Sequence, residues 1–251
     1  MSSQSIQQAV ALFIDARRSG QLLDGLPASC QPKTLDDAHA IQDATAAALG
    51  DTIAGWKVGA PIDGQVVRGV LLRSRMLTSP ARISAAQVPL QGVEAEIAFR
   101  FDRDLPARGR DYDCAEVADA VTAMAAIEIV DSRLRGYPDV PMLDRIADCV
   151  SNGAFVQGTL QSRWRDIDLA TLRVELTIDE RSIVQRVGGH PAGDPLLPAL
   201  ALVNDLRRRD GVRAGQIMTT GTYTGMNYAK PGETVTASFE NFGLAQVLFV
   251  D

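Results

Sequence analysis

Hydrophobic residues recur at helical spacing near the start of the chain and at alternating positions in much of the remainder. Ile6, Val10, Phe13 and Ile14 follow a period of about 3.6 residues, and the pattern stops at Gly20. Because glycine commonly ends a helix, this pattern predicts a first helix that closes at Gly20.

A second helix is expected between Thr34 and Gly50. Thr34 is followed three residues later by Asp37, which is a variant of the capping box, and Gly50 stands where a C-terminal cap belongs. The two helices together predict a small helical lobe at the N-terminus. The buried stripe of the second helix is expected to consist of Leu35, Ala38, Ile41, Ala48 and Leu49.

From about residue 52 the pattern changes to short extended runs separated by Gly, Pro and Asp. The segment 52–61 is expected to be a strand that enters a turn, and strict alternation over 93–101 predicts the clearest strand of the chain. A helix is expected to open at Asp113 and to continue to Met124, followed by a short strand over 126–130.

The last third of the chain is expected to be mostly strand. Residues 172–187 alternate as a hairpin, and a helix is predicted over 194–206 with a proline near its start. Extended runs at 216–221, 233–239 and 244–250 complete the pattern. The fold class predicted from these elements is α+β, with the strands concentrated after residue 90.

Composition excludes several classes of protein. The 251 residues carry 46% hydrophobic residues and 22% charged residues, which are ordinary globular values, and a net charge of −6 argues against binding nucleic acid. The longest apolar run, 196–203, is too short to cross a membrane, and the first residues lack the features of a signal peptide. Three cysteines without a C-x-x-C pair predict neither disulfides nor zinc, so a cytoplasmic protein is expected.

Two acidic residues on one strand are the first candidates for chemistry. Glu94 and Glu96 point to the same side of their strand, away from its apolar face, and Asp131 follows the next apolar run. Three carboxylates without His or Cys suit Mg²⁺ or Mn²⁺. The alternatives are a solvated outer face for the two glutamates, a helix or turn cap for Asp131, and a structural ion pair between nearby Glu128 and Arg133.

A lysine and a polar loop are the other candidates. Lys57 interrupts an apolar strand, where it could donate a proton or stabilise an enolate, or be an ordinary lysine on an edge strand. The loop 219–225 offers hydroxyls and glycine amides to a carboxylate, or is a turn without a ligand. His39 is expected to be structural and His190 to belong to a turn, so no nucleophilic triad is predicted.

Five motifs in one order carry a family resemblance. They are GWKVG at 55–59, GVEAEIAF at 92–99, AIEIVDSR at 126–133, GHP at 189–191 and TTGTYTG at 219–225. In this order and spacing the chain resembles the 2-keto-4-pentenoate hydratases and 4-oxalocrotonate decarboxylases of the fumarylacetoacetate hydrolase superfamily. The resemblance implies a mixed β-roll or sandwich core over 81–251, with a smaller N-terminal α/β portion over 1–80.

The same resemblance implies the site. It assigns a divalent metal, Mg²⁺ or Mn²⁺, to Glu94, Glu96 and Asp131, with Lys57 close to the bound substrate. It also implies a small-molecule 2-keto acid or dienoate substrate and a homo-oligomer. Three further residues are expected to meet the substrate: Ser151, Gly221 and Thr222.

The function implied is metal-dependent addition of water to a 2-hydroxy-2,4-dienoate, which gives a 4-hydroxy-2-keto acid. A 2-keto acid decarboxylase of the 4-oxalocrotonate type needs the same electron sink and stays open as an alternative. Acylpyruvate C–C hydrolysis is a second alternative, although hydrolases of the superfamily generally use a His–Glu pair on an N-terminal lid, and His39 lies within a well-patterned helix. A non-catalytic partner subunit would not require the set of acids and Lys57.

Overall fold

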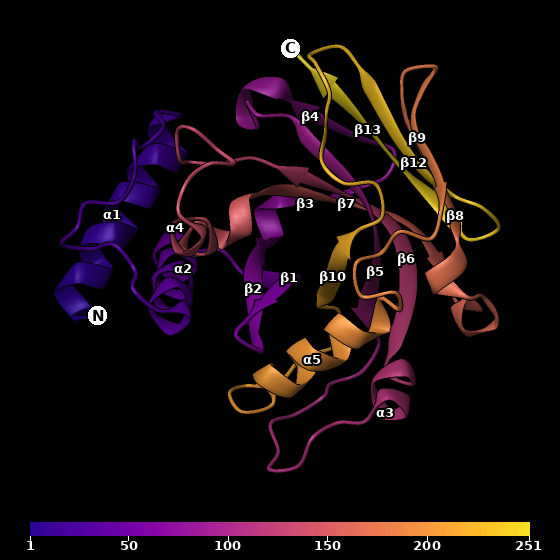
Figure 1. Cartoon of the computed structure of the whole chain (residues 1–251), viewed down its shortest axis with the longest axis horizontal. Coiled ribbons are helices and arrows are strands. Elements are labelled where there is room, and N and C mark those ends of the chain that lie inside the picture. Colours follow the sequence, from indigo (N-terminus) through magenta and orange to yellow (C-terminus); the bar gives the residue numbers. More distant parts are fainter.

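Two β-sheets form the body of the computed structural model, which describes residues 1–251 (Figure 1). The large sheet has eight strands and the second has five. In spatial order the large sheet contains β2 (Gln65–Leu72), β1 (Ile53–Ile62), β10 (Ile217–Thr222), β5 (Gly92–Phe101), β6 (Val121–Val130), β7 (Asn152–Gln161) and β3 (Met76–Thr78), and the short β11 (Asn227–Tyr228) also pairs with β5. The second sheet contains β4 (Ala81–Ser84), β13 (Gly243–Val250), β12 (Thr234–Phe239), β8 (Arg173–Ile178) and β9 (Arg181–Val187).

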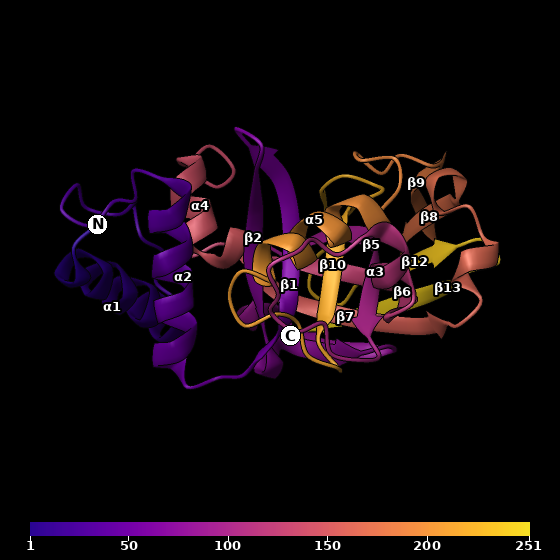
Figure 2. The same ribbon diagram turned by 90° about the horizontal axis from the view of Figure 1, so that it is seen from below.

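Three helices gather at one end of the molecule, beyond β2 (Figure 2). They are α1 (Ser3–Ser19), α2 (Leu35–Leu49) and α4 (Met142–Ala147). Both predicted N-terminal helices are confirmed: α1 ends at Gly20 and α2 at Gly50, each glycine being in the left-handed conformation. The other two helices, α3 (Cys114–Ala118) and α5 (Leu196–Leu206), lie near β5, β6 and β10 (Figure 1).

The main hydrophobic core lies between the two sheets. The apolar side of β5, with Val93, Ala95 and Ile97, belongs to the same cluster as residues such as Ala237 of β12 and Val247 of β13. The strand predicted over 93–101 is therefore confirmed, with its apolar face inward. Since side chains alternate along a strand, the acidic residues of β5 face the opposite side of the large sheet.

The helix predicted from Asp113 to Met124 is wrong over its second half. Asp113 does cap a helix and forms a capping box with Glu116, but α3 ends at Ala118 and β6 begins at Val121. Val121 and Met124 are buried on β6, between β5 and β7. A strand that is buried on both faces shows a continuous apolar run, which in a short window cannot be told from one face of a helix.

The mixed helix and sheet fold confirms the expected α+β class. In the large sheet, β1 and β2 pair directly with each other, and β1 also pairs with β10 from the far end of the chain. A division of the chain into 1–80 and 81–251 stays a prediction. None of the helices has both the length and the apolar character needed to span a bilayer.

Candidate metal and substrate site

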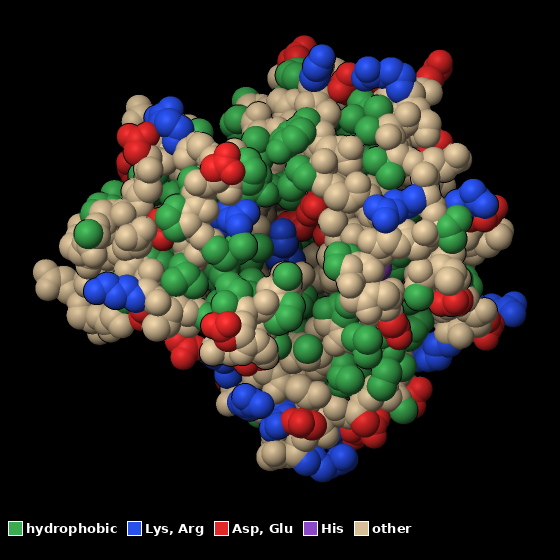
Figure 3. Space-filling model, viewed as in Figure 1, with side chains coloured by type: hydrophobic (Ala, Val, Ile, Leu, Met, Phe, Trp, Pro, Cys, Tyr) green, Lys and Arg blue, Asp and Glu red, His purple; other side chains and the backbone are tan.

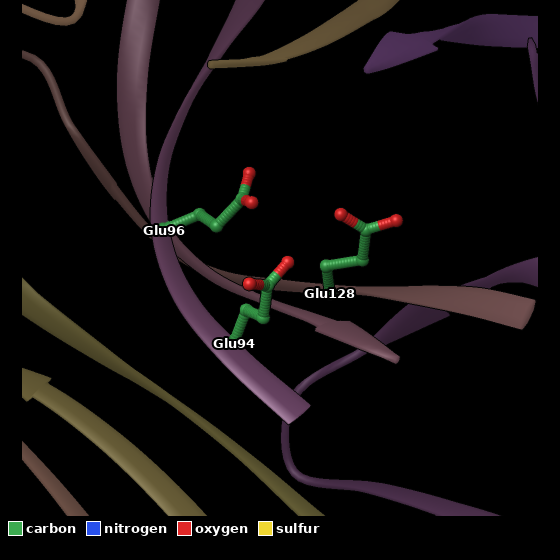
Figure 4. Close-up of side chains that lie close together, drawn as sticks. All are labelled: Glu94, Glu96 and Glu128. Atoms are coloured by element: carbon green, nitrogen blue, oxygen red, sulfur yellow. The ribbon is translucent and has the colours of Figure 1, made fainter. Parts of the chain in front are cut away.

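Three glutamates from two neighbouring strands converge on one side of the large sheet (Figure 4). β5 and β6 pair antiparallel, and Glu94 stands directly opposite Glu128 in the register. Glu96 lies two residues further along β5, so its side chain points to the same face. One oxygen of each carboxylate lies within 4.8 Å of an oxygen of the other two. We call this group the glutamate cluster.

Burial makes the negative charge of the glutamate cluster costly. Glu128 is fully buried and Glu96 is almost so. Burial raises the pKa of Glu96 to about 8, and repulsion from Glu128 and Glu94 adds to the effect. Burial also raises the pKa of Glu94 to about 7, against the attraction of Lys57. A group of carboxylates with such pKa values is stabilised by a nearby cation.

Lys57 supplies one cation to the glutamate cluster. Its Nζ lies 2.6 Å from Oε1 of Glu128 and donates a hydrogen bond of 3.1 Å to the carbonyl of Val150. Burial by itself lowers the pKa of Lys57, but the charges of Glu128, Glu94 and Glu96 outweigh this and hold the pKa above its usual value. Lys57 therefore carries its proton at neutral pH, next to the acids.

One lysine does not neutralise three carboxylates, and the oxygens left over fit a metal ion. Oε1 of Glu128 contacts Lys57 and also accepts from the Asn152 amide at 3.0 Å, whereas its Oε2 is buried without any hydrogen-bond partner. Buried carboxylate oxygens are rarely left without a partner. The three glutamates offer hard oxygen donors, and one of these oxygens, Oε2 of Glu128, has no other partner. Together they form a donor set that Mg²⁺ or Mn²⁺ can use.

A strained turn lies beside Lys57. Cys149, Val150 and Ser151 all have φ between 53° and 56°, in the left-handed region that is costly for a β-branched residue such as Val150. Gly69 makes room for this turn, because a Cβ there would lie 2.5 Å from the Cys149 carbonyl oxygen and 2.8 Å from Cγ of Lys57. The turn directs the Val150 carbonyl at Lys57.

A cavity of about 200 Å³ opens over Lys57 and Glu94. Figure 3 shows a hollow near the middle of this face, with acidic and basic side chains inside it and hydrophobic ones around it. The Ser151 hydroxyl is buried without a hydrogen-bond partner, and Ser151, Tyr137 and Arg145 also line the cavity. The apolar part of the wall comes from Val67, Val130, Met142, Val150 and Met226.

Asp131 lies outside the glutamate cluster. One oxygen of its carboxylate accepts from the Leu90 N–H at 3.0 Å, and the other lies 3.5 Å from the guanidinium of Arg133. Arg133 in turn donates to Asp148 at 2.7 Å, and Arg17 of α1 reaches the same carboxylate at 3.2 Å. This buried network ties the end of β6 to the helical lobe.

The loop 219–225 supports the glutamate cluster from the side of β10. The Thr219 hydroxyl donates to Oε2 of Glu96, and the Gly221 N–H lies 3.3 Å from the same oxygen. Thr222 pairs with Glu96 in the register, and its hydroxyl lies 3.5 Å from that of Thr224. Gly221 and Thr222 are thus beside the candidate metal ligands, whereas Ser151 lies in the cavity on the side of Lys57.

Glu128 is the functional candidate that sequence reasoning missed. The signal was present, because Ile127 and Ile129 alternate with Glu128, which places the acid on the polar face of its strand. Neither histidine belongs to the cluster. His39 accepts from the Arg68 N–H at 3.3 Å, whereas Nε2 of His190 lies 2.8 Å from the carbonyl of Thr220, in the loop that supports Glu96.

Comparison with known proteins gives the family. No family model matches the chain. The chain is 32% identical to 2-keto-4-pentenoate hydratase of Paraburkholderia phymatum, with 97% of each protein covered, and 32% identical to 2-keto-4-pentenoate hydratase 2 of Dechloromonas aromatica, with 95% of this chain and 94% of that protein covered. The solved structure of 4-oxalocrotonate decarboxylase from Pseudomonas putida G7, complexed with magnesium and adipate, has the same fold, with a TM-score of 0.86 at 20% identity over 100% of this chain and 99% of that one. The chain therefore belongs to the 2-keto-4-pentenoate hydratase family.

Proposed function

We propose that this protein is a metal-dependent hydratase that adds water to a 2-hydroxy-2,4-dienoate and releases a 4-hydroxy-2-keto acid. The observation that carries the proposal is the convergence of three glutamates, two of them buried, and Lys57 at one small cavity. The names of the relatives agree with it, since they include 2-keto-4-pentenoate hydratases and a 2-hydroxyhexa-2,4-dienoate hydratase of Comamonas testosteroni.

The proposed metal ligands are Glu94, Glu96 and Glu128. Glu128 takes the place that the sequence prediction gave to Asp131, because Asp131 lies with Arg133 outside the cluster. When bound, Mg²⁺ or Mn²⁺ supplies positive charge that stabilises the enolate form of a 2-keto acid. The buried Oε2 of Glu128, which lacks a partner, supports this assignment.

Lys57 is the proposed proton carrier. It holds a proton on Nζ, it lines the cavity, and it contacts Glu128 at 2.6 Å, so it can give a proton to the dienolate and receive one back. The elements of water end up on the distal double bond of the substrate, the hydroxyl on C4 and a proton on C5. The enol becomes the 2-keto group as its hydroxyl proton is lost and a proton is added to C3. The Val150 carbonyl fixes the direction of the ammonium group.

Three residues are proposed to hold the substrate. Ser151 has a buried hydroxyl free to donate to a substrate oxygen. Gly221 and Thr222 are proposed to meet the carboxylate end of the substrate from the side of Glu96. The cavity wall is largely apolar, which suits the hydrocarbon part of a dienoate.

Product identification tests the proposal. The purified protein is incubated with 2-hydroxypenta-2,4-dienoate and Mg²⁺, and the expected product is 4-hydroxy-2-oxopentanoate, detected by mass spectrometry and by loss of the diene absorbance. Release of carbon dioxide from 2-oxo-3-hexenedioate without hydration of any dienoate would instead identify a decarboxylase. Cleavage of an acylpyruvate to pyruvate and an acid would identify a hydrolase.

The position of His39 argues against hydrolase activity. His39 is buried in α2 and accepts a backbone hydrogen bond from Arg68, and burial lowers its pKa to about 4, so it is held as a structural group.

Assembly as a homo-oligomer and a cytoplasmic location, both expected from the sequence, are part of the same proposal.

A further inference from the structure

One guanidinium in the cavity has no anionic partner. Arg145 belongs to α4, is half-buried, and forms no ion pair with any carboxylate. The one side-chain acceptor it contacts is the thioether sulfur of Met142, at 3.1 Å, and thioethers are weak acceptors. Its Nε is fully buried and has no hydrogen-bond partner at all.

The two buried arginines of the molecule, Arg68 and Arg133, are paired with carboxylates, although Nε of Arg68 also has no partner. Half-buried Arg75, which lines a different cavity, forms no ion pair either. Arg68 donates to both oxygens of Asp43, at 2.7 and 2.6 Å, and Arg133 donates to Asp148 at 2.7 Å. Arginine has five donors in a planar fork that matches a carboxylate, and a buried donor without a partner is costly. Arg145 is therefore a guanidinium without the carboxylate partner that its donors match.

The position of Arg145 indicates that a bound ligand supplies this carboxylate. Arg145 lines the same cavity as Lys57 and Glu94, and it makes no ion pair with Glu94. Its guanidinium lies 6.0 Å from the ring of Tyr137, and Met142 stands next to it. A ligand in the cavity thus meets Lys57 and Glu94 of the glutamate cluster as well as the free guanidinium of Arg145.

We propose that Arg145 determines specificity by binding a second, terminal carboxylate of the substrate. The inference rests on the proposed function, in which the 2-keto acid end of the substrate lies at the glutamate cluster. The hydrocarbon part then passes Tyr137 and Val130, and the far end reaches Arg145. The preferred substrates are accordingly 2-hydroxy-2,4-dienoates that end in a carboxylate rather than in a methyl group.

Binding of saturated analogues tests this inference without requiring turnover. 2-Oxohexanedioate ends in a carboxylate, whereas 2-oxohexanoate of the same length ends in a methyl group. 2-Oxoheptanedioate and 2-oxoheptanoate form a second pair that is one carbon longer. Each is titrated by calorimetry into the protein in the presence of Mg²⁺. The wild-type protein is expected to bind the diacid of at least one pair about 10-fold more tightly than its monoacid, the scale of one hydrogen bond to a charged group.

Arg145→Gln is expected to remove the preference for that diacid and to leave the affinity for the monoacid within about twofold. Arg145→Lys keeps the charge but loses the fork, and is expected to retain part of the preference. Arg163→Gln removes the same charge from an exposed site where Arg163 pairs with Asp166, and is the matched control, for which wild-type preference is expected.

Three results would overturn the inference: no preference for a diacid at either length, a preference that survives Arg145→Gln, or equal losses for diacid and monoacid. The last would assign Arg145 to the carboxylate that every 2-keto acid carries. Hydration of 2-hydroxypenta-2,4-dienoate is measured separately on the same preparations. A diacid preference that depends on Arg145, without any hydration, would contradict the proposed reaction but not the role of Arg145 in binding a terminal carboxylate. Hydration without that preference would contradict the role of Arg145 alone.

Discussion

Replacing Lys57 by Met removes the cation that contacts Glu128 and keeps most of the aliphatic stem. Lys57 Nζ lies 2.6 Å from Glu128 Oε1, and the Glu128 side chain is completely buried. Breaking a buried ion pair from one side costs roughly 3–5 kcal/mol of folding free energy, because the other charge stays buried without a partner. In a protein of this size that loss lowers the melting temperature of the metal-free protein by on the order of 10 °C.

The same substitution tests the role of Lys57 in the reaction. If Lys57 moves a proton, kcat at saturating Mg²⁺ is expected to fall about 10²- to 10⁴-fold, which is the usual contribution of a positioned acid–base group. Because Mg²⁺ offsets the uncompensated charge of Glu128, the melting temperature of Lys57→Met is expected to recover largely when the metal is added. Lys230→Met, at an exposed lysine, is the control and is expected to behave as wild type in both measurements.

Steady-state kinetics and thermal melting with and without Mg²⁺ separate the two effects. A kcat within about threefold of wild type would refute the role of Lys57 as a proton carrier. An unchanged melting temperature of the metal-free variant would refute the argument that Glu128 depends on Lys57 for its charge balance.

The remaining predictions concern the charge of the glutamate cluster and the turn beside it. Burial raises the pKa of Glu96 to about 8 and of Glu94 to about 7 from an ordinary value of 4.5, so the folded metal-free protein binds more protons than the unfolded chain. Its melting temperature is therefore expected to fall as the pH rises from about 5 to 8, and saturating Mg²⁺ is expected to remove most of this fall; a flat profile without metal would be contrary to the prediction. Gly69→Ala places a Cβ 2.5 Å from the Cys149 carbonyl oxygen, which displaces the strained turn, and turnover is expected to drop at least about 10-fold. Gly109→Ala, where a Cβ meets nothing within 4 Å, is the control, and equal activity of the two variants would contradict the role given to the turn.

The parts of the fold that could be predicted from the sequence are those set by local interactions. The cap at Thr34 and the glycine at Gly50 lie within one helix, and the alternation over 93–101 lies within one strand, so each signal is complete in a short window. The helix predicted beyond Ala118 failed because burial of β6 on both faces depends on β5 and β7, which a local pattern cannot reveal.

The site could be predicted in part for the same reason. Glu94 and Glu96 share one strand, and their common orientation follows from alternation alone. Glu128 joins them through the pairing of β5 with β6, in which Glu94 lies opposite a residue 34 positions further along the chain. The register of this pairing cannot be derived from the local sequence pattern. Asp131 comes three residues after Glu128, directly after the end of β6, and pairs with Arg133 instead. The free guanidinium of Arg145 likewise became visible only with the cavity around it.

Metal affinity measured on two matched variants tests the central claim most directly. Mg²⁺ and Mn²⁺ are titrated by calorimetry into the metal-free wild-type protein, Glu128→Gln and Asp131→Asn, each variant exchanging one carboxylate for an amide of the same shape. If the metal is held by Glu94, Glu96 and Glu128, Glu128→Gln is expected to weaken binding by at least about 100-fold, whereas Asp131→Asn stays within about threefold of wild type. Normal metal binding by Glu128→Gln together with loss of binding in Asp131→Asn would contradict the account.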